Sequence, residues 1–341
     1  MGIEAVTKTL SDETGKTGLP AETKATGTRL RTWIAWTAAG GSAAWVVSRA
    51  LGLDAVPGLD RIAVPFLALT PYAAAGALLS VLTAALLRRW YATLTATAAA
   101  LALGVTLQPP PTADAPVAAH GPEVRLLTAN VFFGRASMAE LVEIVKTERV
   151  DVLSLQEFTP DARSGLEEEG LRAQLPYEVV DPRWGAAGSG LYSRYPLTAL
   201  PPLPGTVMAH PRAALELAGR KVEVTAVHPL PPIDPQGRAD WKHSLSTLPT
   251  ATSGGALNIL AGDFNATLDH ARFRGLLDRG GYTDAADRDG GGLKSTWGFS
   301  GFPRLTLDHI LIPPSVAVRS YDVLRLSGSD HRPVLATLRL P

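Results

Sequence analysis

Asp263 and Asn265 stand two residues apart, directly after the apolar run from Leu257 to Ala261. Such a run predicts a buried strand, and side chains alternate along a strand, so we expect both polar groups to face the same space. A carboxylate placed beside a carboxamide can orient or deprotonate a water molecule. The alternative is an Asx turn at the end of a strand, which Gly-Asp-x-Asn also fits. These two residues alone do not decide between the two interpretations.

Other predicted strands also end on polar or ionisable side chains. These strand ends are Asn130, Glu157, His228 and Asp308, and the last strand is preceded by Asp330 and His331. Active sites are commonly built at one end of a sheet from residues that several strands carry. A single polar residue at the end of a strand is not informative. Polar residues at the ends of this many strands are not explained by turn chemistry. The sequence therefore predicts an active site at one edge of a sheet.

Short strands and helices alternate from Glu123 onward. Apolar runs predict strands over 124–131, 150–158, 189–193, 213–217, 222–227, 257–261, 305–312, 316–326 and 333–340. Helical spacing of apolar residues predicts helices over 136–149 and 234–248. This order indicates an α+β domain over residues 123–341.

Composition excludes several kinds of chemistry. The chain of 341 residues contains no cysteine, which excludes disulfides, thiol catalysis and cysteine-based zinc sites. Its formal net charge is zero, and residues 121–341 contain 23 Lys and Arg against 25 Asp and Glu. Proteins that bind duplex nucleic acid usually carry a basic stripe and a raised pI. A nucleic-acid partner is therefore not favoured.

The N-terminal third contains three long apolar runs. Residues 32–48 and 62–87 carry no charge, and a third charge-free run begins at Trp90. A transmembrane helix needs about 17–25 apolar residues, so we expect three such helices over about 32–51, 62–87 and 90–107. The alternative is a set of buried helices in a soluble core. We interpret residues 1–28 as a disordered tail and the proline-rich residues 108–122 as an extended linker.

Basic residues predict the orientation of these helices. The tail carries Lys and Arg residues up to Arg31, and Arg88 and Arg89 lie between the second and third runs. The positive-inside rule places both segments in the cytoplasm. The protein is then expected in the cell membrane as a multi-pass protein, with its C-terminal domain outside the cytoplasm. The orientation reverses if the first run does not span the bilayer.

The polar strand ends occur in an ordered set of short motifs. They are Thr128-Ala129-Asn130, Leu155-Gln156-Glu157, Gly190-Leu191-Tyr192-Ser193-Arg194, His228-Pro229, Gly262-Asp263-Phe264-Asn265, Leu307-Asp308-His309-Ile310 and Ser329-Asp330-His331-Arg332-Pro333. In order and spacing this set resembles the endonuclease/exonuclease/phosphatase superfamily across about residues 121–341. The resemblance implies a four-layered α/β sandwich, in which two packed mixed sheets flanked by helices share a site at one edge. Together with the apolar N-terminal region, the chain also resembles the VanJ-type teicoplanin-resistance proteins of bacteria.

The resemblance also implies roles for these residues. It implies that Glu157 is the main metal ligand, with Asn130 and Asp330 beside the metal. Glu157 offers hard oxygens that suit Mg²⁺, and Mn²⁺ is a second possibility.

The remaining roles concern the phosphate and the water. The resemblance implies that Asp308 pairs with His331, which contacts the phosphate, that Asp263 activates water and that Asn265 holds the water or the phosphate. His228 would contact a phosphate or serve as an acid for the leaving oxygen. Arg212 could reach a phosphate, as a similar Arg does in some relatives, but a strand-edge Arg is an equal alternative. His309 points the opposite way from Asp308 on a strand and is expected to be structural.

Three classes of function compete. A membrane tether raises the effective concentration of a site toward lipid phosphates. The sequence therefore favours an extracytoplasmic, Mg²⁺-dependent hydrolase of a lipid-linked phosphate or pyrophosphate. The resemblance points to undecaprenyl pyrophosphate and to a contribution to glycopeptide resistance. The alternatives are a membrane-tethered nuclease or phospholipase C/sphingomyelinase-like phosphodiesterase, and a non-catalytic phosphate-binding module. The bond type and the oligomeric state stay open.

Overall fold

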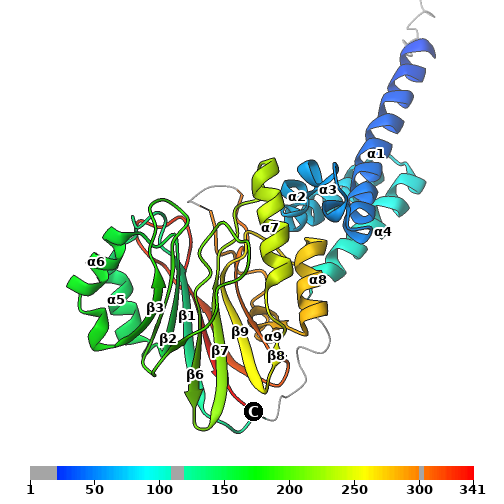
Figure 1. The fold of residues 1–341 in the computed structure, drawn as a ribbon. Helices are drawn as coiled ribbons and strands as arrows, with labels where there is room; N and C mark the ends of the chain where they lie inside the picture. Colours follow the sequence, from blue (N-terminus) through cyan, green and yellow to red (C-terminus); the bar gives the residue numbers. More distant parts are fainter. Residues whose placement is uncertain (1–20, 109–118, 299–302) are drawn as a thin grey trace, which may run out of the picture. The chain divides into compact units, whose positions relative to one another are not determined.

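The C-terminal part of the chain is built around two mixed β-sheets (Figure 1). The computed structural model describes residues 21–108, 119–298 and 303–341. The strands are β1 (Glu123–Asn130), β2 (Val152–Gln156), β3 (Tyr177–Asp181), β4 (Ser189–Ser193), β5 (Thr198–Ala199), β6 (Arg212–Leu217), β7 (Arg220–Val227), β8 (Thr252–Ser253), β9 (Ala256–Asp263), β10 (Thr283–Asp284), β11 (Asp308–Ile312), β12 (Ala317–Val323) and β13 (Val334–Arg339). The helices of this part are α5 (Met138–Thr147), α6 (Pro160–Glu168), α7 (Pro235–Thr247), α8 (Ala271–Gly280) and α9 (Ala285–Arg288).

The strand order gives each sheet one parallel pair at its centre. The first sheet runs β12-β13-β1-β2-β4-β3, and the second runs β10-β11-β9-β7-β6-β5 with β8 beside β9. β1 is parallel to β2 and β7 is parallel to β9, while the other pairs are antiparallel. The carboxyl ends of β1 and β2 therefore lie at one edge of the first sheet. Those of β7 and β9 lie together at one edge of the second.

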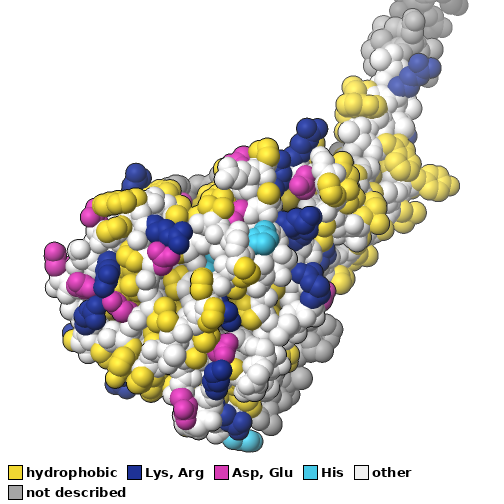
Figure 2. All heavy atoms as spheres, in the orientation of Figure 1, with side chains coloured by type: hydrophobic (Ala, Val, Ile, Leu, Met, Phe, Trp, Pro, Cys, Tyr) yellow, Lys and Arg dark blue, Asp and Glu magenta, His cyan; other side chains and the backbone are white. Residues whose placement is uncertain are grey.

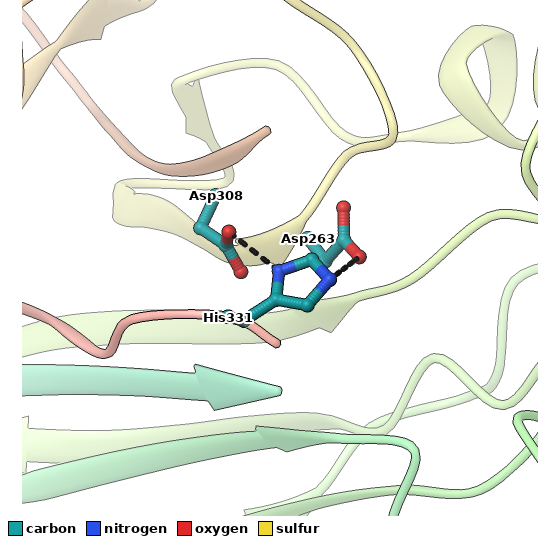
Figure 3. A group of neighbouring side chains, drawn as sticks. All are labelled: Asp263, Asp308 and His331. Carbon is teal, nitrogen blue, oxygen red and sulfur yellow. Dashed lines mark hydrogen bonds and ion pairs between the residues drawn. The ribbon is translucent and has the colours of Figure 1, made fainter. Parts of the chain in front are cut away.

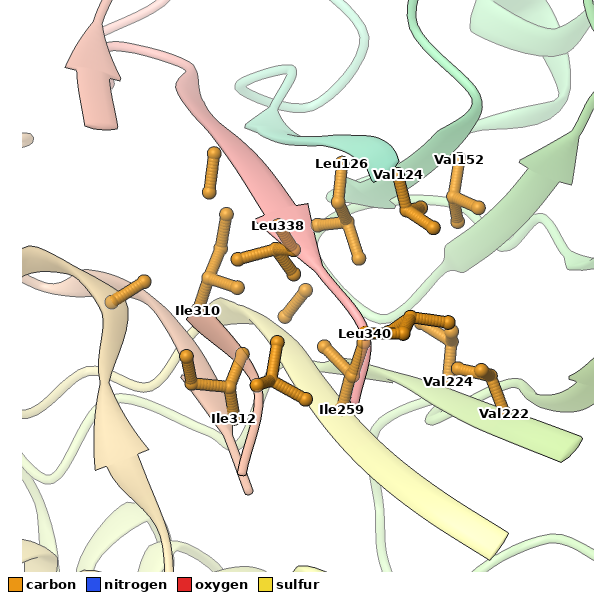
Figure 4. Packing of buried hydrophobic residues seen from close by; sticks show 14 of the residues in the cluster. Val124, Leu126, Val152, Val222, Val224, Ile259, Ile310, Ile312, Leu338 and Leu340 are labelled. Atoms are coloured by element: carbon orange, nitrogen blue, oxygen red, sulfur yellow. The ribbon is translucent and has the colours of Figure 1, made fainter. Parts of the chain in front are cut away.

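The two sheets pack face to face through their apolar side chains (Figure 4). Leu126 and Leu338 of the first sheet belong to the same buried cluster as Val224, Ile259 and Ile310 of the second. A second cluster packs α5 and α6 on the outer face of the first sheet, and a third packs α7 and α8 on the outer face of the second. Figure 1 shows the resulting helix–sheet–sheet–helix arrangement. The predicted α+β fold of two packed mixed sheets with helices is confirmed.

Gly262 allows β9 to approach β7 closely just before Asp263. A Cβ atom at this position would lie 1.9 Å from the carbonyl oxygen of Val227. No side chain fits that space, so glycine is required there. The close approach places Asp263, the last residue of β9, beside the end of β7.

The first third of the chain is helical, with bounds that differ from the predicted spans. Its helices are α1 (Ala21–Ala50), α2 (Asp60–Leu67), α3 (Thr70–Leu86) and α4 (Trp90–Thr106), with a short 3-10 turn at Leu53–Ala55. Residues 1–20 of the predicted tail and residues 109–118 of the predicted linker lie outside the described residues. The structure places residues 21–28, which include the helix former Lys24, in α1 rather than in the tail.

The prediction of a single helix over residues 62–87 is wrong, because two helices, α2 and α3, occupy this range. The helix breaks at Ala68 and Leu69, and Pro71 lies in the first turn of α3. A continuous helix is disfavoured here because a proline has no N–H to donate to the carbonyl four residues earlier, and its ring clashes with that carbonyl. Among the described residues no single helix is both long and apolar enough to cross a bilayer. By length and composition only α2 and α3 together would suffice, and they are bent by 77° at their junction. The helix α4 is apolar but shorter.

The chain divides into two compact units. The first combines Met1–Ala43 with Ala75–Ala100, and its described helices pack through small side chains (Ala35, Ala39, Ala84, Ala92 and Ala96). The second combines Ala44–Ala74 with Leu101–Pro341. Residues 44–74 therefore belong to the same unit as the β-sandwich, which differs from a domain that begins at residue 123.

Buried polar contacts join residues 44–74 to the β-sandwich within the second unit. Arg49 forms an ion pair of 2.6 Å with Asp269, and the fully buried Asp54 accepts a hydrogen bond from the Ala271 amide at the start of α8. His270 contacts the carbonyl oxygen of Val64 through Nε2, at 2.9 Å. These contacts fix α2 and the turn before it to the β-sandwich.

His309 is the second residue of β11, and its buried side chain packs against Phe273 of α8. Its Nδ1 lies 2.6 Å from an Asp284 carboxylate oxygen and its Nε2 lies 2.9 Å from the Ala266 carbonyl oxygen. Both partners accept hydrogen bonds, so both ring nitrogens carry protons and the ring is cationic. Burial alone would lower the pKa of His309, but the Asp284 carboxylate raises it above its usual value.

We predict that His309→Gln removes a pH-dependent share of the stability. Because the folded pKa is raised, this share is complete below the unfolded pKa of about 6.5 and is lost as pH rises through the folded pKa. Urea unfolding at pH 6 should show a loss of about 1–3 kcal/mol, and the difference should narrow at pH 9. His120→Gln, at an exposed position, serves as the control. A difference that does not change with pH would contradict this assignment.

Candidate active site

Six of the predicted site residues meet where the two sheets share an edge. Asn130 ends β1, Glu157 follows β2, His228 follows β7, Asp263 ends β9, Asp308 begins β11 and His331 lies just before β13. All six are buried. Asp308 begins its strand rather than ending it, because β11 runs antiparallel to β9 and pairs Asp308 with Asp263. The edge where these residues lie is called the active-site edge below.

The Asn130 amide joins carboxylates of the two sheets. Its Nδ2 donates to Glu157 Oε1 at 3.1 Å and to Asp263 Oδ2 at 3.2 Å, while its Oδ1 accepts from the Phe132 amide at 2.9 Å. The Phe133 amide donates to the other Glu157 oxygen at 2.9 Å. Burial raises the pKa of Glu157 to about 7, although the Asn130 hydrogen bond opposes this rise. The two carboxylates are thus held close together with few neutralising groups.

His331 lies between two aspartates (Figure 3). Its Nδ1 is 2.8 Å from Asp308 Oδ2 and its Nε2 is 3.5 Å from Asp263 Oδ2. Burial alone would lower the pKa of His331, but Asp308 and Asp263 raise it to about 10. The ring is therefore cationic at neutral pH. A cationic ring held by a carboxylate can bind a phosphate oxygen or stabilise developing negative charge.

His228 completes the group from the second sheet. Its Nε2 lies 3.7 Å from Asp263 Oδ2 and 4.0 Å from Glu157 Oε1. Burial lowers the pKa of His228 to about 4, so its ring is neutral at neutral pH. A neutral ring offers one N–H donor but no ready proton for an acid step. The lowered pKa of His228 therefore favours a phosphate contact over the role of an acid.

Asp263 and Asn265 do form an Asx turn. The Asn265 amide donates to Asp263 Oδ1 at 2.8 Å, and Asn265 has a φ of 47°, so it is not part of the strand. The expectation that strand alternation places both side chains on one face is wrong. The Asn265 side chain instead donates to the Pro229 carbonyl at 3.1 Å, which holds the segment after His228. The turn and the polar site are therefore both present.

Left-handed backbone is concentrated at this edge. Phe132, Phe133, Glu157 and Asn265 are non-glycine residues with φ between 47° and 55°. Such conformations carry strain and persist only where surrounding contacts hold them. Their position beside the buried carboxylates indicates that the backbone here is shaped for the site.

Glu157 and Asp330 offer carboxylate oxygens of the kind that bind divalent cations. Asp330 accepts from the Trp297 indole through Oδ2 at 3.1 Å, while its buried Oδ1 has no hydrogen-bond partner in the described part of the chain. Ser329 donates to the Asn130 carbonyl at 2.8 Å, which holds the loop before His331 next to β1. The unpartnered Asp330 oxygen suits Mg²⁺ or Mn²⁺, and the Glu157 oxygens, which accept hydrogen bonds from Asn130 and Phe133, are of the same hard type. The Asn130 side chain directs its Nδ2 toward the carboxylates of Glu157 and Asp263. Asn130 therefore acts as a hydrogen-bond donor beside the candidate metal site and not as an oxygen ligand.

Asp263, Asp308 and His331 form a second group of possible ligands. One ligand atom from each lies within 4.8 Å of the others, and all three residues are buried. However, Nδ1 of His331 is hydrogen-bonded to Asp308, and the ring is cationic, so it has no free lone pair for a metal. These three residues are better suited to contacts with the phosphate than to a metal.

Several supporting residues were not predicted from the sequence. Thr296 accepts hydrogen bonds from the Leu307 and Asp308 amides, each at 3.0 Å, and so fixes the start of β11. A buried polar chain runs from Thr128 through Gln156 to Ser154, whose hydroxyl donates to the Ala261 carbonyl of the other sheet. Trp297 donates a hydrogen bond to Asp330 through its indole N–H.

Arg212 is not brought into the cluster. Its guanidinium lies 3.6 Å from Glu223 and donates to the Pro201 carbonyl at 3.2 Å. It lines a cavity of about 360 Å³ together with His210, whose Nδ1 accepts from the His228 amide. A substrate-binding role for Arg212 would therefore concern this adjoining cavity rather than the phosphate.

A four-layered sandwich with buried carboxylates and an Asp–His pair at one edge defines a class of phosphate-ester hydrolases. The chain belongs to the Endonuclease/Exonuclease/phosphatase family, whose sequence profile matches residues 127–331. Members of this family are metal-dependent phosphodiesterases, phosphatases and nucleases. The predicted enzyme class, a metal-dependent phosphatase or phosphodiesterase, is confirmed.

Two solved structures illustrate how far the fold extends. An endonuclease/exonuclease/phosphatase from Beutenbergia cavernae DSM 12333 is 18% identical, with a TM-score of 0.51 over 64% of this chain and 72% of that one. A family protein from Leptotrichia buccalis C-1013-b is 16% identical, with a TM-score of 0.50 over 63% of this chain and 99% of that one. At these low sequence identities the similarity shows a shared fold and nothing further. None of the curated proteins compared with the chain matches it.

We predict that Asp308→Asn lowers the rate of phosphodiester hydrolysis at least about a hundredfold, because His331 loses the carboxylate that holds it cationic. Hydrolysis of bis(p-nitrophenyl) phosphate with Mg²⁺ measures the rate, and circular dichroism checks the fold. Asp322→Asn, at an exposed position of β12, should leave the rate unchanged. Activity of Asp308→Asn within twofold of the wild type would refute the role of this pair.

Proposed function

We propose that this protein is a membrane-anchored, Mg²⁺-dependent phosphohydrolase that acts on a lipid-linked phosphate or pyrophosphate. The observation that carries the chemistry is the convergence of Glu157, Asp263, Asp308 and His331 at one edge of the two sheets. The apolar helices α3 and α4 precede this site in the same chain and support the choice of a lipid substrate.

The residues around the phosphate have distinct tasks in this proposal. The cationic ring of His331 binds a phosphoryl oxygen and stabilises the charge that develops on it. Burial raises the pKa of Asp263, which brings this carboxylate toward the range that suits a general base for water. The neutral ring of His228 donates to a second phosphoryl oxygen. Asn265 holds Asp263 and the segment after His228 in place, and its side-chain oxygen can hold the water.

Glu157 and Asp330 would hold the metal, and Asn130 would keep Glu157 in position. A bound Mg²⁺ supplies charge neutralisation to the phosphate and to the leaving oxygen. Mn²⁺ suits the same oxygens. The buried Asp330 oxygen without a described partner supports this assignment.

The face shown in Figure 2 gives no support to a duplex nucleic-acid substrate. On the face shown in Figure 2, Lys and Arg side chains alternate with Asp and Glu over the sandwich and form no continuous basic stripe. The resemblance to VanJ-type proteins, with their anchored external domain, points to undecaprenyl pyrophosphate and to a contribution to glycopeptide resistance. A phospholipase C/sphingomyelinase-like diesterase and a membrane-tethered nuclease are the second candidates, because the same residues serve these reactions.

We predict phosphate release from undecaprenyl pyrophosphate by the purified full chain with Mg²⁺, and none with EDTA. The screen includes phosphatidylglycerol, sphingomyelin and plasmid DNA at matched enzyme concentration, and Asp263→Asn is the inactive control. No release from any lipid phosphate, together with degradation of DNA, would contradict the proposed substrate class.

The orientation is tested by the same assay in right-side-out membrane vesicles. An extracytoplasmic site should hydrolyse a membrane-impermeant phosphodiester added outside, without detergent. Activity that appears only after the vesicles are opened would place the site in the cytoplasm.

A further inference from the structure

Large hydrophobic side chains are exposed on the loops of the active-site edge. Phe133 follows β1, Trp184 follows β3, Val207 precedes β6 and Ile233 follows β7, so all four leave the sheets at the same end as Asp263. Their exposed fractions are 42%, 70%, 49% and 78%. Within residues 119–298 and 303–341 the only others are Tyr177, at the opposite end of β3, and Leu293 after α9. The apolar exposure is thus concentrated at the end of the sheets where the site lies.

The helix α2 continues this surface. Ile62 and Phe66 of α2 are 62% and 51% exposed. Asp60 of the same helix lies 3.6 Å from Arg238 in the first turn of α7, which begins just after Ile233. The contact of His270 with the Val64 carbonyl holds α2 in this position. The exposed apolar side chains of α2 therefore belong to the same compact unit as the site.

Arginines without acidic partners lie on the loops of the same edge. They are Arg135 after β1, Arg304 before β11, and Arg325 and Arg332 between β12 and β13. In the described ranges none of the four has a carboxylate within ion-pair distance, whereas Arg125 and Arg163 pair with glutamates at 2.7 Å. Burial and the nearby Arg304 and Arg325 lower the pKa of Arg332, which is consistent with three cations close together.

We propose that this edge is a contact surface for an anionic lipid bilayer. It consists of Phe133, Trp184, Val207, Ile233, Ile62, Phe66 and the four arginines, and is called the rim below. Apolar and aromatic side chains that surround a site can enter the headgroup region of a bilayer, while arginines bind lipid phosphates and lie near an anionic surface. The inference rests on the proposed function and narrows its substrate to phosphates that a membrane presents directly to the site.

The composition of the rim favours a bilayer over a nucleic acid. Single-stranded nucleic acids bind to aromatic side chains that stack on successive bases. Val207, Ile233 and Ile62 are aliphatic and cannot stack in this way. Aliphatic exposure combined with arginines instead matches the apolar interior and anionic surface of a bilayer.

The absence of cysteine from the sequence allows a direct test. The full chain with Ile233→Cys is labelled with the environment-sensitive fluorophore NBD and reconstituted into vesicles of phosphatidylcholine and phosphatidylglycerol. We expect a blue-shifted emission that lipid-borne doxyl groups quench. Tyr177→Cys, labelled in the same way at the opposite end of β3, should report an aqueous environment. Both positions are exposed, so both variants should fold.

The arginines are tested in the labelled Ile233→Cys chain. Arg304→Gln with Arg325→Gln should weaken the quenching in vesicles that contain phosphatidylglycerol, but not in pure phosphatidylcholine. Arg220→Gln, at the opposite edge of the second sheet, is the matched control and should change neither signal.

The outcomes separate this inference from the proposed function. If the label at position 233 reports an aqueous environment in anionic vesicles, as at position 177, the proposed contact between the rim and the bilayer is wrong. This holds even if lipid phosphate is hydrolysed. Quenching at position 233 without hydrolysis of any lipid phosphate supports the rim and overturns the proposed substrate. An aqueous signal in vesicles that changes when single-stranded DNA is added identifies a nucleic-acid surface and also overturns the rim.

Discussion

The burial of several carboxylates at one place is the constraint on which this structure depends. Glu157, Asp263 and Asp308 all lie out of solvent at the meeting of two sheets. Buried like charges are unfavourable unless cations or hydrogen-bond donors neutralise them. The chain supplies the cationic ring of His331 and the amide of Asn130, and a divalent cation beside Glu157 and Asp330 would supply the rest. The groups that neutralise the buried carboxylates are therefore the same groups that are proposed to act on the phosphate.

This constraint explains the polar contacts that join the two sheets. Asn130 of the first sheet donates to Asp263 of the second, and Ser154 of the first donates to the Ala261 carbonyl of the second. Below these contacts the interface between the sheets is apolar. The apolar core holds the sheets together, while the polar contacts set the distance between their edges. A shift of one sheet against the other would separate the groups that must act on one phosphate.

Sequence patterns predicted the parts of this arrangement that follow from periodicity. Apolar runs located β1, β2, β7 and β9, and the polar residue after each run pointed to the shared edge. Local backbone geometry was not predictable in the same way. The left-handed conformation of Glu157 and Asn265 depends on surrounding contacts, so strand alternation gave the wrong reason for the position of Asn265.

Contacts between distant segments were also beyond sequence patterns. The hydrogen bonds of Thr296 to the start of β11, and of Asp54 to α8, join residues whose partners no spacing rule identifies. Residues 44–51 and 62–74 lie in the predicted membrane spans because their sequence is largely apolar. Their buried polar contacts instead attach them to the β-sandwich.

In the proposed site a metal lies beside Glu157 and the cationic ring of His331 contacts the phosphate. Anomalous scattering from crystals of the full chain soaked in Mn²⁺ tests this division most directly, because it locates the metal independently of activity. We expect one peak in contact with oxygens of Glu157 and Asp330, and none bonded to His331. A peak coordinated by His331 together with Asp263 or Asp308 would contradict it.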